Sequence, residues 1–182
     1  MDNNLGVAYL LVLMGLLIGA SFFVVRQIFK TRRVEGTLSR LEGKLGREAG
    51  TAQEYYGLGC IYNDKKLYSQ AVVTFQKALK AIETEENPQN VAMIHNALGY
   101  AYFSQEQYDI AIRQYKEALK QVPQYVIALN NLGYAYERKK LTAQALEAYE
   151  KSLQFEPGNT IAQRKVKSLQ KRIGVPDAST TD

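Results

Sequence analysis

The sequence contains few of the residues that build catalytic, metal or disulfide sites. Its 182 residues include no tryptophan, one cysteine (Cys60) and one histidine (His95). A single cysteine closes no intramolecular disulfide, and no paired Cys and His spacing suits a structural zinc. His95 has no acid or nucleophile motif beside it that would complete a catalytic triad. These shortages predict a chain that is not an enzyme and has no metal, cofactor or small-molecule substrate, with Cys60 as a packed thiol rather than a redox sensor.

Basic residues are more numerous than acidic ones, but they are unevenly placed. The net charge is +5, and residues 26–50 carry seven bases against three acids. Residues 51–159 carry 11 bases and 12 acids, whereas residues 160–173 carry five bases and no acid. A protein that binds nucleic acid needs a basic stripe on its folded body, and here that body is close to neutral. We therefore predict no nucleic-acid partner.

The long apolar run lies at the N-terminus. Residues 5–25 include 21 positions without a charge, which as a helix would span the roughly 30 Å hydrocarbon core of a bilayer. The residues before the run include no base, so an uncleaved anchor is favoured over a cleaved secretory signal. Basic residues follow the run and predict, by the positive-inside rule, that the C-terminal side faces the cytoplasm or stroma. These flanking bases are Arg26, Lys30, Arg32 and Arg33. We predict a single-pass transmembrane anchor over residues 1–25.

The segment after the anchor has a weak helical pattern. Val34, Leu38, Leu41 and Leu45 share one helical stripe, which is compatible with a short coiled coil. Four glycines interrupt residues 34–50, and each costs a helix up to about 1 kcal/mol. We predict a partly helical basic linker over residues 26–50.

The rest of the chain repeats a spaced motif three times. Each unit has Leu-Gly, a Tyr three residues after the Gly, and an Ala nine residues after the Tyr. The three sets are Leu58, Gly59, Tyr62 and Ala71; Leu98, Gly99, Tyr102 and Ala111; and Leu132, Gly133, Tyr136 and Ala145. The second and third glycines are 34 residues apart, whereas the first and second are 40 apart. A period of this size predicts stacked helical hairpins with a six-residue insertion between the first two units.

The residue types follow from hairpin packing. The Gly and the later Ala leave room where two helices approach, and Pro123 and Pro157 stop the second helix of a unit. We predict repeats over about 52–85, 92–125 and 126–159, followed by a capping helix over 160–173 and a disordered tail over 174–182. In the cap, the residues expected to pack inward are Ile161, Val166, Leu169 and Ile173. The bases of the cap are expected to face water.

The repeated motif resembles the tetratricopeptide-repeat family. The resemblance implies an all-α fold, in which residues 51–173 form a superhelix of hairpins with a concave surface that binds protein partners. It places the partner-binding groove at Tyr56, Asn63, Asn96, Tyr100, Phe103, Asn130, Tyr134 and Glu137, with Cys60 beside them. Large aromatic rings and amides suit a polypeptide ligand. The alternative interpretation is that these Asn and Tyr residues only form a solvated helix face.

The order of parts in the whole chain resembles the photosystem I assembly-related tetratricopeptide proteins of cyanobacteria and plastids. The N-terminal residues 1–33 carry most of this resemblance. It implies a thylakoid membrane protein whose repeats lie on the cytoplasmic or stromal side and whose partners are photosystem I subunits or assembly factors. The residues alone equally allow a general membrane-anchored adaptor for another complex or targeting pathway.

Overall fold

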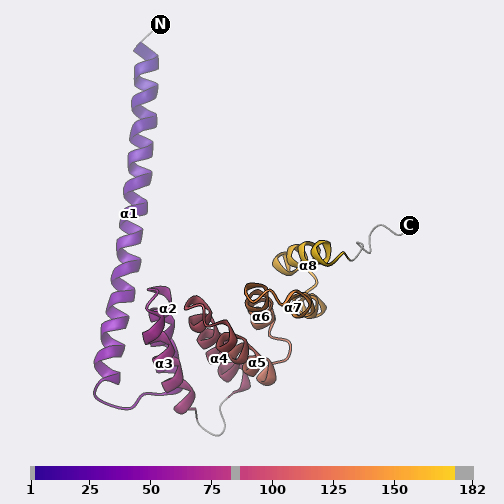
Figure 1. The fold of residues 1–182 in the computed structure, drawn as a ribbon. Helices are drawn as coiled ribbons and strands as arrows, with labels where there is room; N and C mark the ends of the chain where they lie inside the picture. Colours follow the sequence, from indigo (N-terminus) through magenta and orange to yellow (C-terminus); the bar gives the residue numbers. More distant parts are fainter. Residues whose placement is uncertain (1–2, 83–86, 175–182) are drawn as a thin grey trace. The chain divides into compact units, whose positions relative to one another are not determined.

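The computed structural model describes residues 3–82 and 87–174, which form eight α-helices and no strand (Figure 1). The helices belong to two compact units, Met1–Arg47 and Glu48–Asp182. Residues 83–86 of the predicted insertion and residues 175–182 of the predicted tail lie outside the described residues.

The first unit is one long helix, α1 (Asn3–Leu45). By length and apolar composition it is the one described helix that is able to cross a membrane, and that apolar part is wholly exposed. In this part, the large apolar side chains are exposed all round the helix rather than on one stripe, as the consecutive residues Leu10, Leu11 and Val12 illustrate. The helix also continues without a break to Leu45, through most of the predicted partly helical linker over residues 26–50. Adding residues to an existing helix is easier than nucleating a new one, so α1 tolerates Gly36 and Gly43.

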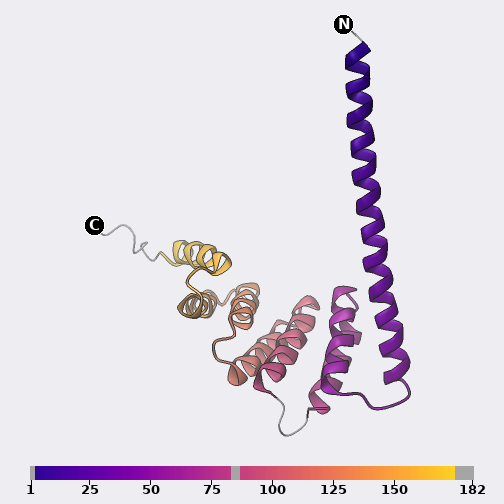
Figure 2. The ribbon, with the colours of Figure 1, turned by 180° about the vertical axis from the view of Figure 1, so that it is seen from behind.

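The second unit contains the remaining seven helices. They are α2 (Ala52–Asp64), α3 (Tyr68–Lys80), α4 (Pro88–Ser104), α5 (Tyr108–Gln121), α6 (Val126–Arg138), α7 (Thr142–Phe155) and α8 (Thr160–Ile173). Helices α2 and α3, α4 and α5, and α6 and α7 pair as hairpins, and α8 packs on α7 (Figures 1 and 2). The fold is therefore the predicted all-α stack of three hairpins and a cap.

Several helix ends have local causes that can be read in the sequence. Thr51 and Glu54 form a capping box at the start of α2. Helix α4 begins at Pro88, four residues before the expected start of the second repeat, because Asn87 caps it and Pro88 occupies its first turn. Helices α5 and α7 end two residues before Pro123 and Pro157, respectively.

The repeated glycines lie under an aromatic ring of the partner helix. A Cβ atom on Gly59 would lie 2.5 Å from Cε1 of Phe75, and one on Gly99 would lie 2.7 Å from Cε1 of Tyr115. At Gly133 the nearest atom is Cζ of Tyr149, at 2.8 Å. All three rings are buried in the core, so an added Cβ atom would force each ring to shift. The glycine of the motif is therefore a requirement of ring packing within the hairpin.

The turn inside each hairpin has the same backbone conformation. Lys66, Glu106 and Lys140 each adopt a positive φ of 60–61°. In the third hairpin, the N–H of Lys140 donates to the carbonyl of Glu137, and the N–H of Leu141 donates to that of Tyr136, both at 2.9 Å. This pattern terminates a helix with a left-handed residue, a position that glycine usually occupies.

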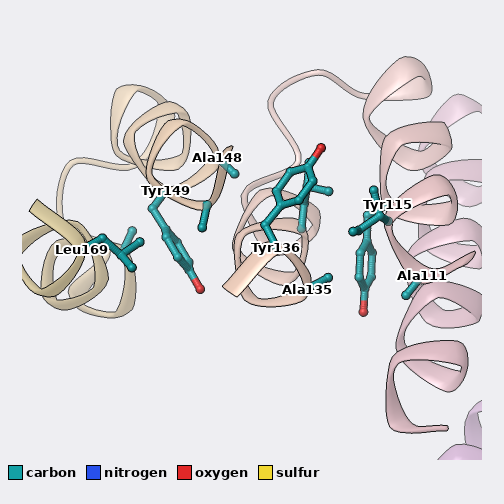
Figure 3. Close-up of a cluster of buried hydrophobic side chains, with 11 residues drawn as sticks. Ala111, Tyr115, Ala135, Tyr136, Ala148, Tyr149 and Leu169 are labelled. Carbon is teal, nitrogen blue, oxygen red and sulfur yellow. The ribbon is translucent and has the colours of Figure 1, made fainter. Parts of the chain in front are cut away.

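The first helices of the hairpins lie closer together than the second helices. Helix α4 contacts both α2 and α6, while comparable contacts are absent among the described residues of α3, α5 and α7. A stack whose first helices are closer curves toward them, so α2, α4 and α6 line its inner face. Buried Tyr115, Tyr149 and Leu169 belong to the core that continues into the cap (Figure 3).

The cap differs from the prediction in two respects. Leu169 is buried and Val166 packs against the core as expected, but Ile161 and Ile173 are 50% and 44% exposed. The small side chain of Ala162 takes the inward position in the first turn instead. Gly174 ends α8 in the left-handed conformation, with φ of 70°.

Candidate partner-binding groove

A cavity of about 230 Å³ opens on the inner face between the second and third hairpins. Its lining residues are Tyr100, Phe103, Tyr115, Asn131 and Tyr134. Helix packing explains this set, because positions spaced by three or four residues on α4 and α6 point to the same side. We call this cavity and the inner-face residues around it the groove.

Aromatic rings form one wall of the groove. Tyr100 and Tyr134 occupy equivalent positions in their repeats, and each is 45% exposed. Phe103 packs edge-on against Tyr134, with ring centroids 5.9 Å apart, and against Tyr108 at 5.3 Å. Rings held by their neighbours lose little further freedom when a ligand covers them. The wall is therefore suited to contacts with apolar side chains.

Amides lie along the same face. Asn131 donates from Nδ2 to Oδ1 of Asn96 at 2.9 Å, which joins α6 to α4. Asn63 donates from Nδ2 to the carbonyl of Ala97 at 3.4 Å, which joins α2 to α4. Within the part of the chain that the structure describes, the buried Oδ1 atoms of Asn63 and Asn130 accept no hydrogen bond. These two oxygens are buried, so they belong to the packing between the first helices, whereas Asn131 also lines the cavity.

The capping helix contributes a charge to this face. Glu137 accepts from the hydroxyl of Tyr149 at 2.8 Å and pairs with Nζ of Lys165 at 2.8 Å. The same ammonium lies 4.3 Å from the ring centroid of Tyr134. Lys165 was expected to face water with the other bases of the cap, but its side chain is only 28% exposed. The acid of the groove therefore already has a partner, and Lys165 holds α8 to α6.

Tyr56 and Cys60 lie together in the first hairpin. The ring of Tyr56 packs on that of Phe75, with centroids 6.0 Å apart, and the side chains of Tyr56 and Cys60 are both partly buried. Burial raises the pKa of the Cys60 thiol above its ordinary value, and a hydrogen bond with Tyr56 opposes this only in part. Burial, followed by the influence of Cys60, likewise raises the pKa of Tyr56. A thiol with a raised pKa carries little thiolate at neutral pH, which favours a packing role.

The structure brings together only part of the predicted set. Tyr100, Phe103 and Tyr134 line the cavity, whereas Tyr56, Asn63, Asn96 and Glu137 lie elsewhere on the first helices and Asn130 does not line it. Asn131 and Tyr115 were not predicted. Asn130 occupies the same position in the third repeat as Asn96 in the second, but the neighbouring Asn131 makes the contact between the helices. Tyr115 is a buried core residue of its hairpin that also lines the cavity.

Stacked hairpins with a recessed aromatic and amide face define a scaffold for binding other proteins. Family models described as tetratricopeptide repeat match residues 50–124 and 96–160. The chain belongs to the tetratricopeptide-repeat family, whose members bind protein partners.

Two relatives show similarity along nearly the whole chain. The ycf37 protein of Cyanophora paradoxa is 35% identical over 173 residues, which cover 95% of this chain and 99% of that protein. The chloroplastic tetratricopeptide repeat domain-containing protein PYG7 of Arabidopsis thaliana is 34% identical over 172 residues. That match covers 94% of this chain and 56% of PYG7.

Solved structures share the fold at low identity. MamA superimposes with a TM-score of 0.72 and 22% identity over 80% of this chain and 82% of its own. The first repeat domain of Spaghetti (RPAP3), bound to an HSP90 peptide, gives a TM-score of 0.62 and 20% identity. It covers 70% of this chain and 96% of its own.

Proposed function

We propose that this protein is a membrane-anchored scaffold that assists the assembly or stabilisation of photosystem I. In this proposal, α1 crosses the thylakoid membrane once and the repeats lie on the cytoplasmic or stromal side. The groove binds a photosystem I subunit or assembly factor. The observation that carries the proposal is that one chain combines a repeat scaffold with a long helix whose apolar part is exposed.

The exposure of α1 supports the anchor. Leu10, Leu17 and Phe23 are each at least 62% exposed, and they lie among other exposed apolar side chains. In water such a surface has no favourable environment, whereas a bilayer core solvates it and leaves all helix hydrogen bonds intact. The flanking bases on the C-terminal side, of which Arg26, Arg32 and Arg33 are exposed, support the proposed orientation.

The relatives support the location and the process. A ycf37 protein that matches end to end and a chloroplastic protein that matches over most of this chain are consistent with a photosynthetic membrane. The anchor would confine the groove to the membrane surface and so raise its effective concentration toward subunits inserted in the same bilayer. No covalent chemistry is required of the scaffold.

Crosslinking and affinity purification of the tagged full-length protein from thylakoids would test the proposal. The test variant is Tyr100→Ala/Tyr134→Ala, which removes both exposed rings of the groove. The matched control is Val73→Ala/Phe155→Ala, which truncates two apolar side chains on α3 and α7 that are 53% and 46% exposed.

We expect photosystem I subunits to be recovered with the wild type and the control, and to be depleted with the groove variant. A different and reproducible partner set would support a general adaptor instead. Photosystem I content that is unchanged in a deletion strain under several light regimes would contradict the assembly role.

A further inference from the structure

A second and larger cavity, of about 540 Å³, lies between α5 and α7. Both helices pack on α6, whose Leu129, Leu132 and Tyr136 provide the apolar floor. Helices α5 and α7 form the two walls. The volume lies within the range of about 300–1,000 Å³ that is usual for ligand sites. We call it the α5–α7 cavity.

The α5–α7 cavity is separate from the groove. The two cavities have no lining residue in common. In Figure 3 the hydroxyl of Tyr136 points to the opposite side of the core from the hydroxyls of Tyr115 and Tyr149. A ligand in the α5–α7 cavity would therefore leave the inner face open.

Two of the residues that line this cavity differ from their equivalents one repeat earlier. At the preceding junction, the positions equivalent to Leu129 and Ala148 are held by His95 and Gln114. There the His95 Nδ1 and Gln114 Oε1 atoms are joined by a hydrogen bond of 2.9 Å, so a polar pair bridges α4 and α5. At the α5–α7 cavity, Leu129 and Ala148 form no such hydrogen bond. Their side chains together also occupy less space than those of His95 and Gln114. The polar bridge of the preceding junction is thus missing at the α5–α7 cavity.

A third substitution places a charge at the rim. At the preceding junction, Gln76 donates from Nε2 to the hydroxyl of Tyr102 at 3.0 Å. The equivalent pair at the α5–α7 cavity is Lys116 and Tyr136, with Nζ of the lysine 5.8 Å from the ring centroid. A neutral hydrogen bond has thus been replaced by an ammonium beside an aromatic floor.

Lysines stand on both walls of the α5–α7 cavity. Lys116 and Lys120 lie on α5 and Lys151 lies on α7, whereas the one lining acid is Glu147. Lys120 pairs with Glu117 at the exposed rim, at 2.7 Å, but Lys151 makes no ion pair with any residue that the structure describes. An apolar floor with a lysine on each side favours a ligand with an apolar group flanked by negative charges.

We propose that the α5–α7 cavity is a second protein-binding site, which takes an acidic segment carrying one large apolar side chain. The apolar side chain rests on Leu129, Leu132 and Tyr136, and carboxylates before and after it face the lysines of the two walls. A single lipid headgroup would place its charge at one wall only, whereas a chain that crosses the cavity meets both. This site goes beyond the proposed function, which uses only the groove.

Fluorescence anisotropy with short labelled peptides would test the site. The probes have blocked ends and a central Leu, Phe or Trp flanked on both sides by Glu and Asp, with matched sets flanked by Ser or by Lys. The full-length protein is held in nanodiscs of zwitterionic lipid. We expect at least one acidic probe to bind the wild type more tightly than its Ser and Lys counterparts, with affinity that falls as salt is added.

The decisive variant is Leu129→His/Ala148→Gln, which installs the bridging pair that already packs at the preceding junction. It should abolish peptide binding with an unchanged far-UV circular dichroism spectrum. If it fails to fold, Lys151→Glu reports on the rim alone and should weaken binding about tenfold, because it replaces an attraction by a repulsion.

Several results would overturn the proposal. These are the absence of binding by any acidic probe, unchanged binding to the bridged variant, or unchanged binding to Lys151→Glu. Loss of binding in the groove variant Tyr100→Ala/Tyr134→Ala would assign the peptide to the groove instead. Displacement of the probe by anionic lipid in the nanodisc, abolished in the bridged variant, would assign the cavity to a lipid. Failure of partner recovery in thylakoids leaves each of these peptide readouts unaffected.

Discussion

Two glycines on α2 allow the same substitution to be tested with and without a steric clash. Gly57 and Gly59 lie two residues apart in the interior of this helix. A Cβ atom on Gly57 meets nothing within 4 Å, whereas one on Gly59 would lie 2.5 Å from Cε1 and 2.7 Å from Cδ1 of Phe75. Phe75 is 0% exposed, so its ring has no open space to move into.

The expected free energies follow from two effects. Alanine is favoured over glycine in a helix interior by about 1 kcal/mol, and this gain applies at both positions. Gly57→Ala should therefore stabilise the protein by about that amount. Overpacking a filled core costs about 1–3 kcal/mol, so Gly59→Ala should be neutral to destabilising by about 2 kcal/mol. The difference between the two variants isolates the steric cost at about 1–3 kcal/mol.

Urea unfolding of the full-length protein in neutral nanodiscs, followed by far-UV circular dichroism, would measure this difference. The double variant Gly59→Ala/Phe75→Leu serves as a control, because removal of the ring should make the alanine less costly than it is beside Phe75. Equal stability of Gly57→Ala and Gly59→Ala would refute the argument that the motif glycine exists to admit the ring.

Three further predictions concern single positions. Ser152 is fully buried, and its hydroxyl has no hydrogen-bond partner among the described residues. Ser152→Ala should therefore raise the free energy of unfolding by about 1 kcal/mol, and a lower free energy of unfolding would contradict this. Lys140 has φ of 60°, so Lys140→Gly should also stabilise, by about 1 kcal/mol, whereas the same change at Lys139, with φ of −86°, should not. Burial raises the pKa of the Cys60 thiol, so less thiolate is present in the folded protein than in the unfolded one. Cys60 should therefore react with iodoacetamide at pH 8 more slowly in the folded protein than in urea, and equal rates would contradict the raised pKa.

The hairpins and their boundaries were predictable because their causes are local. The spacing of the motif set the number of hairpins, and Pro123 and Pro157 marked the ends of α5 and α7. The glycine at each close approach was likewise visible as a repeat, although its partner ring was not. Helix α1 was predicted in its apolar part but not in its length, because propagation past Gly36 and Gly43 depends on the helix that precedes them.

The binding surfaces were decided by contacts between segments distant in the sequence. The choice of Asn131 over Asn130, and the recruitment of Lys165 to Glu137, depend on how α4 and α8 lie on α6. At the α5–α7 cavity, Leu129 of α6 and Ala148 of α7 form no hydrogen bond with each other. One repeat earlier, the equivalent His95 and Gln114 join α4 to α5 by such a bond. Periodicity assigns a side chain to a face of its helix, but only the packing of the helices determines what that face meets.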